Sequence, residues 1–177
     1  MRGFARIACI ALLAAACHRG EAAKQNPPFD ANAFIVTTAN LARSDVDLGD
    51  LALRKARLPE TRQLGAIVGV EQRTLLAALA PLAERRKIVM PAVLEDRRAA
   101  LHQNLSMLPG QVFDRAWALA MVQDYDAILR GLGDAAQSGD DDLRAFAARV
   151  RPTISARRTD AGELLARLGG TPFNVAP

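Results

Sequence analysis

Four long segments of this chain carry apolar residues at alternating steps of three and four positions, the spacing of one face of an α-helix. Residues that disfavour continued helix separate the segments, at Leu58-Pro59, Met90-Pro91, Leu108-Pro109-Gly110 and Ser138-Gly139. No segment shows the two-residue alternation of a half-buried strand. The pattern therefore restricts the chain to folds in which helices bury one stripe each against their neighbours.

The segments predict four long helices and a short one. Long helices are expected at about 31–56, 60–86, 111–137 and 140–168, and a shorter helix at about 92–107. Because short connections join the long helices, we predict an all-α fold: a four-helix bundle with an additional short helix between the second and third long helices. The bundle domain is expected at residues 30–170, followed by a tail at 171–177.

Composition agrees with one globular domain. Half of the 177 residues are apolar and only 5% are aromatic, which favours helices and argues against disorder. The net charge is +4, and a leader containing Arg2 and Arg6 would take two of those charges with it. The remaining chain is nearly neutral, so we expect no nucleic-acid partner.

The N-terminus resembles an export signal. Arg2 and Arg6 precede the apolar run Ile7–Ala16, which is too short to span a bilayer, and Cys17 follows it directly. We interpret residues 1–16 as a signal peptide. The stretch Leu13–Cys17 resembles the lipidation box of bacterial lipoproteins, in which Cys17 becomes the first residue and carries the lipid. Ordinary cleavage after Ala16 is the alternative.

Lipidation of Cys17 would use the last thiol of the exported chain, because Cys9 lies inside the leader. Residues 17–29 are then a lipidated N-terminus and a polar tether that contains Asn26-Pro27-Pro28. This interpretation predicts a protein of the cell envelope that faces the periplasm, with the outer membrane as the expected membrane. Its partners would be that membrane, through the lipid anchor, and an envelope protein of unknown identity.

One polar residue interrupts each long apolar stripe: Asp45, Glu71, Tyr125 and Arg157, with Asp124 adjacent to Tyr125. Charges are costly in a core unless they are paired, so these positions predict a buried polar cluster. We hypothesise that the Arg157 guanidinium binds the Asp45 and Glu71 carboxylates together and that Tyr125 donates its hydroxyl. Alternatively, Asp45 and Glu71 lie at stripe edges, Arg157 extends into solvent, and Tyr125 is an ordinary core aromatic.

Four motifs carry a resemblance to a known family. They are Asp45–Leu53, with its Leu-Gly-x-Leu-Ala; Leu108–Trp117, with Phe-Asp-Arg; Met121–Tyr125; and Leu143–Ala147 followed by Pro152. In order and spacing they resemble the bacterial family of predicted outer-membrane proteins with a ferritin-like domain, domain of unknown function 4142. The resemblance covers about residues 31–168 and implies a ferritin-like bundle.

The chain departs from this family at its polar positions. The family's histidines in the second, third and fourth long helices fall at Glu71, Tyr125 and Arg157, and its first-helix Glu falls at Asp45. The only histidines are His18 and His102, and no Glu-x-x-His pair of a ferritin-like metal site occurs. We therefore expect no metal, no cofactor and no catalytic residue.

Three functions compete at this point. The first is a non-catalytic exported lipoprotein with a structural or interaction role in the envelope. The second is a metal-binding or redox protein that uses a carboxylate-only site at Asp45, Glu71 and Asp124, since hard cations accept oxygen ligands. The third is an exported module that binds unfolded or hydrophobic clients on a helical face. No nucleophile elbow, phosphate loop or dinucleotide fingerprint points to an enzyme.

Overall fold

The computed structural model describes residues 29–169. The predicted signal peptide, Cys17, the tether up to residue 28 and the tail at 171–177 lie outside these residues. The described part is all-α, with five helices and no strand, which confirms the all-α part of the prediction. The helices are α1 (Ala31–Lys55), α2 (Pro59–Arg85), α3 (Asp96–Met107), α4 (Gly110–Gln137) and α5 (Asp141–Arg167).

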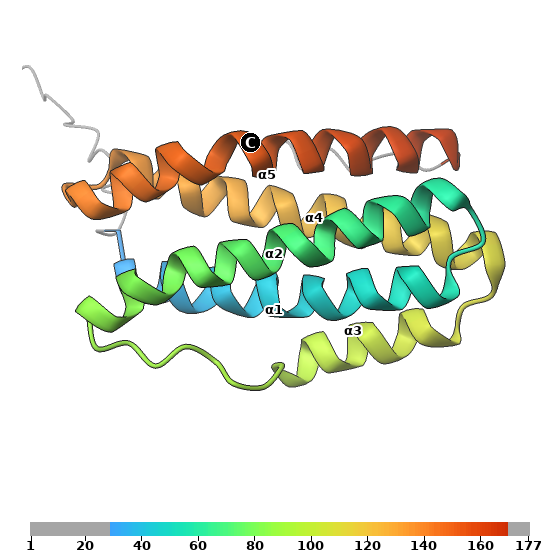
Figure 1. Cartoon of the computed structure of the whole chain (residues 1–177), viewed down its shortest axis with the longest axis horizontal. Coiled ribbons are helices and arrows are strands. Elements are labelled where there is room, and N and C mark those ends of the chain that lie inside the picture. Colours follow the sequence, from blue (N-terminus) through green and yellow to red (C-terminus); the bar gives the residue numbers. More distant parts are fainter. Residues whose placement is uncertain (1–28, 170–177) are drawn as a thin grey trace, which may run out of the picture.

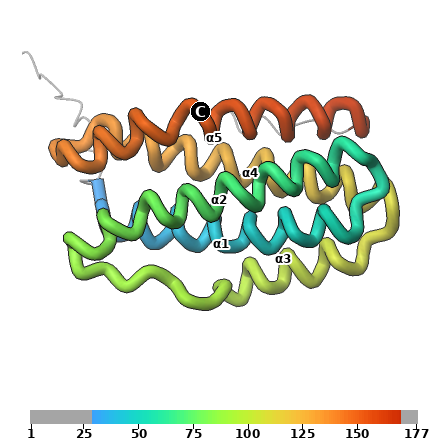
Figure 2. The backbone as a smooth tube through the Cα atoms, viewed as in Figure 1, coloured from blue at the N-terminus to red at the C-terminus, as the bar shows by residue number. Residues whose placement is uncertain are grey.

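The four long helices pack side by side in a bundle (Figure 1). Helix α1 packs against α2 and α4, and α5 completes the ring against α4 and α2. The backbone tube shows that α1 and α5 run in one direction and α2 and α4 in the other, with α3 lying along the outside (Figure 2). Helix α3 contacts α1 and α4, so it covers the seam between these two helices.

Local sequence explains where the helices begin. Asp30 caps α1 by accepting hydrogen bonds from the backbone N–H groups of Asn32 and Ala33. Asp140 caps α5 in the same way, accepting from the N–H of Leu143. Pro59 occupies the first position of α2, where a missing N–H costs nothing.

Glycines bring α1 and α2 unusually close. A Cβ atom on Gly49 would lie 2.6 Å from the carbonyl oxygen of Gly65, and a Cβ on Gly65 would lie 2.6 Å from the Cβ of Ala52. A larger residue at either position would therefore force the two backbones apart. The short connection from α1 to α2 and this close contact make the pair the tightest unit of the bundle.

The short helix begins later than predicted. The sequence pattern indicated a start near residue 92, whereas α3 begins at Asp96 with Glu95 as its N-cap. The preceding residues 88–95 are not helical, and Ile88 and Met90 pack against the core from this loop. Only Leu105 of α3 is buried, so this helix contributes little to the apolar core.

Helix α2 is the one helix in residues 29–169 that is long and apolar enough to cross a membrane by length and composition. The core helix of a protein without membrane spans passes the same test, and α2 does pack against α1 and α5.

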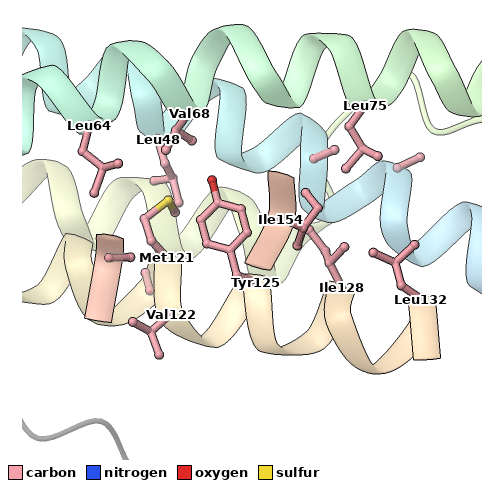
Figure 3. Packing of buried hydrophobic residues seen from close by; sticks show 14 of the residues in the cluster. Leu48, Leu64, Val68, Leu75, Met121, Val122, Tyr125, Ile128, Leu132 and Ile154 are labelled. Carbon is pink, nitrogen blue, oxygen red and sulfur yellow. The ribbon is translucent and has the colours of Figure 1, made fainter. Parts of the chain in front are cut away.

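The core stripe of α2 generates a first prediction. Leu75 is 4% exposed and faces the centre of the bundle (Figure 3). Leu75→Ala should lower the free energy of unfolding by about 2–5 kcal/mol, because it removes buried methyl groups and leaves a cavity. Val112 is 57% exposed, so Val112→Ala is the matched control. Urea unfolding followed by circular dichroism measures both, and equal small effects would mean that the α2 stripe does not face the core.

Candidate functional site

The predicted polar residues form two groups in the structure. The first group, which we call the Arg98 cluster, consists of Asp45 on α1, Asp124 on α4 and Arg98 on α3. Nη1 of Arg98 donates to Oδ1 of Asp124 at 2.8 Å, and Nη2 donates to the second oxygen, so this pair is bidentate. Nη2 also lies 3.5 Å from Oδ1 of Asp45. The guanidinium therefore lies against two carboxyl groups at once.

Asp45 is the most deeply buried ionisable group of this cluster, with 0% exposure. Burial raises the pKa of the Asp45 carboxyl well above its ordinary value, and the charge and hydrogen bonding of Asp124 raise it further. The Arg98 cation opposes the shift without cancelling it. Burial alone would lower the pKa of Arg98, but the hydrogen bond and the charge of Asp124 outweigh it, so that pKa is raised. Arg98 is a fixed cation, and Asp45 is the proton-holding acid.

The second group contains Glu71 on α2 with Arg157 and Asp160 on α5. Nε of Arg157 lies 3.2 Å from Oε2 of Glu71, and Nη1 of Arg157 donates to Asp160. Both Glu71 and Arg157 are partly exposed, with 27% and 22% of their side-chain surfaces accessible. Burial raises the pKa of Glu71; Arg157 lowers it, and Asp160 adds to the rise.

The hypothesis that Arg157 joins Asp45 to Glu71 is wrong in this structure. Within the described part of the chain, Arg157 pairs with Glu71 and Asp160, whereas Asp45 pairs with Arg98. The reason is the order of the helices around the bundle. Helix α5, which carries Arg157, packs against α2 and α4, while the neighbours of α1 are α2, α3 and α4.

Tyr125 lies between the two groups. It is fully buried, and its hydroxyl points from α4 toward α2 (Figure 3). Burial raises the pKa of this hydroxyl, the charges of Asp45 and Glu71 raise it further, and Gln72 and Arg157 act against the rise. Tyr125 therefore stays protonated and serves as a neutral polar group inside the core.

Three polar residues that take part in the bundle's polar contacts or lie buried in it were not predicted from the sequence. Arg98 lies on the short helix, where no strong apolar stripe marked a buried face. Gln72 is fully buried on α2, and its spacing of four from Val68 is the signal that could have identified it. Asp114 is fully buried and accepts hydrogen bonds at 3.1 Å from the backbone N–H groups of Arg57 and Leu58.

Asp114 fastens the turn between α1 and α2 to α4, and Trp117 fastens α1 itself to α4. The indole N–H of Trp117 donates to the carbonyl of Leu48 at 2.9 Å, while Asp114 holds the two N–H groups of the turn. Both side chains belong to the Leu108–Trp117 segment. That segment therefore has a structural role, which its resemblance to a family motif did not specify.

The carboxylates do not assemble into a metal-binding group. Across residues 29–169, no set of three or more His, Cys, Asp or Glu side chains is placed to hold a metal ion. Asp45 and Asp124 lie against the Arg98 cation, and Glu71 belongs to the other group. His102 lines a surface hollow with Asp47 and Asp50, away from both groups.

Two fully buried aspartates lead to a second prediction, because replacing each by asparagine should change the stability of the protein in a different way. The native state holds the Asp45 proton more tightly than the unfolded chain does, so the wild type loses stability as pH rises from the unfolded pKa, about 3.9, to the raised folded pKa. Asp45→Asn has no such proton to lose. Its stability relative to the wild type should rise with pH across this window and then level off.

Asp114→Asn is the matched comparison. An amide has one acceptor oxygen for the two N–H donors of Arg57 and Leu58, so this change should destabilise the protein by about 1–3 kcal/mol at neutral pH. Denaturant unfolding of the two variants and the wild type, from about pH 4 to about pH 8, measures both effects. A relative loss of stability by Asp45→Asn as pH rises would contradict the assignment of the buried proton.

A family model described as "Domain of unknown function (DUF4142)" matches residues 16–164. No curated protein and no solved structure matches the chain.

Proposed function

Since the chain belongs to the DUF4142 family, whose function is unknown, we propose from its own residues that it is an exported bacterial lipoprotein. In this proposal its bundle is ferritin-like and non-catalytic, and it has a structural or interaction role in the cell envelope. The domain begins just after the tether, and Cys17 anchors it to the outer membrane, facing the periplasm.

The observation that carries the non-catalytic role is the position of Arg98. Its guanidinium lies against both inner carboxyl groups, where an exchangeable metal would otherwise find oxygen ligands. A cation fixed by the chain itself repels another cation at this short range. The protein's own side chains thus occupy the polar centre. We assign to this centre the structural role of holding α3 on the bundle rather than a catalytic role.

The ferritin-like assignment rests on the arrangement of the helices. Four long helices surround a core whose polar residues come from the middle of the helices, which is where ferritin-like bundles carry their ligands. Here Asp45 and Tyr125 occupy the central positions. The same scaffold therefore carries a charge-compensated centre in place of a metal site.

Anchoring is supported by the order of features along the chain. A basic start, a short apolar run and Cys17 precede the polar tether, and the first helix begins at Ala31. A membrane anchor at Cys17 would hold the bundle near the end where α1 begins.

Lipid labelling tests the anchor, with a control that the chain itself offers. Cells that express the full-length protein and grow with a fatty-acid analogue should label the wild type, because Cys17 would be acylated. Cys17→Ser should lose the label and the association with membranes, whereas Cys9→Ser should retain both. Equal labelling of the wild type and Cys17→Ser would refute the anchor.

Metal content tests the non-catalytic role independently. The full-length wild type, isolated from the envelope in detergent, should contain far less than one metal ion per chain by mass spectrometry of the elements. A stoichiometric metal that is lost in Asp45→Asn would refute the proposal and favour the carboxylate-only site.

A further inference from the structure

The outward face of α2 carries a second stripe that the bundle does not use. Its six positions repeat at steps of four and three, on the side of the helix opposite the core stripe. None of the six is charged. They are Gln63, Ile67, Val70, Thr74, Ala77 and Pro81.

Five of these six side chains are exposed in the single chain, while Gln63 and Ile67 border a hollow that α2 shares with α5. Val70 is 64% exposed, Ile67 is half-buried, and the other four are exposed. The Thr74 hydroxyl already donates to the carbonyl of Val70 at 3.1 Å, so it needs no other partner. We call these six positions the α2 outer stripe.

Burial within the bundle does not explain why α2 is so apolar. Its most apolar window of 18 residues is only 39% buried. The solvent side of α5, by contrast, carries the exposed cations Arg144, Arg149 and Arg151. A helix face turned to water is normally charged, so an uncharged stripe along five turns indicates a covered surface.

Charged residues at the two ends of α2 indicate which kind of partner covers the α2 outer stripe. Glu60 and Arg62 stand at its start, and Glu84 and Arg85 stand at its end. The edge toward α5 carries Glu60 and Arg85, as the ion pair of Arg85 with Asp142 on α5 shows. By helical spacing, Arg62 and Glu84 lie on the other edge.

Two antiparallel copies of α2 would match these charges. The same edges of the helices meet in such a pair, so Glu60 would lie opposite Arg85 of the second copy, and Arg62 opposite Glu84 of the second copy. Both pairings share a midpoint near residues 72 and 73. A parallel pair would bring each outward residue of α2 against its own copy, Ile67 against Ile67 and Ala77 against Ala77, so larger residues would not face smaller ones.

The α2 outer stripe is self-complementary about nearly the same midpoint. Val70 would meet Thr74 of the second copy, and Ile67 would meet Ala77 of the second copy, so larger residues face smaller ones. We propose that α2 is the interface of a two-fold symmetric homodimer, in which the outer stripes of two copies pack antiparallel. This inference does not depend on the lipid anchor.

The size of the interface sets the expected strength. A helix of 27 residues is about 40 Å long, so one helix pair buries less than the about 800 Å² per partner of a standard stable complex. We therefore expect a reversible dimer rather than an obligate one.

Sedimentation equilibrium of the full-length chain in detergent tests the dimer. The wild type should show a concentration-dependent equilibrium between monomer and dimer. Val70→Glu should weaken self-association at least about tenfold, because it places two charges at the centre of the interface. Val112→Glu, on an exposed position of α4, is the matched control and should not change it. Both positions are exposed, so thermal unfolding should show that both variants fold.

Charge reversal tests the antiparallel arrangement. Glu60→Lys should weaken the dimer by opposing Arg85 of the second copy, and the double change Glu60→Lys with Arg85→Glu should restore it. Cys17→Ser should dimerise like the wild type in the same detergent, so failure of the anchor and failure of the dimer are distinguishable.

A photo-crosslinking amino acid at position 70 of the full-length chain tests the contact in cells. An adduct of twice the monomer mass, containing only this chain, is the expected result. A wild type that stays monomeric at all concentrations, a dimer indifferent to Val70→Glu, or adducts only with lipid or with another protein would overturn the proposal.

Discussion

An ionisable side chain at the centre of a helical bundle has to keep its proton or find a fixed counter-charge, and Asp45 is such a side chain. Its neutralisation determines much of the surrounding structure. Burial makes ionisation of Asp45 costly and so raises the pKa of its carboxyl, while Arg98 enters from outside and binds Asp124 beside it. Arg98 can do this only because α3 lies along the seam between α1 and α4.

The same interaction explains how α3 stays in place. Only Leu105 of this helix is buried, so hydrophobic burial alone gives it little hold on the bundle. The bidentate pair of Arg98 with Asp124 and the hydrogen bond from Asn40 to Glu95 add polar contacts at its N-terminal end. The polar centre and the short helix are therefore one structural unit, although they come from distant parts of the sequence.

Sequence reasoning could locate the helices but not the partners of the polar residues. Periodicity depends only on local spacing, so it located the four long helices and the stripe positions of Asp45 and Tyr125. It contains no information on which helices are neighbours. For that reason the pairing of Arg157 with Asp45 was wrong, and Arg98, on a helix without a clear stripe, was missed.

The two proposals together constrain how the protein would lie on a membrane. Helix α1 begins at the end of the bundle where α2 finishes (Figure 1). An antiparallel α2 interface therefore places the two tethers at opposite ends of a dimer at least about 40 Å long. Each tether has 13 residues from Cys17 to Phe29 and reaches at most about 45 Å when extended.

Two anchors at opposite ends can enter the same membrane with least extension when the dimer lies flat. An upright dimer would put one anchor point next to the lipid and raise the other by nearly the full length of the helices, so that one tether would be stretched almost to its limit. Holding a tether near its full extension costs conformational entropy, and the flat orientation avoids that cost. The direction in which α2 pairs would thus also decide which sides of the bundle face the membrane and which face the periplasm.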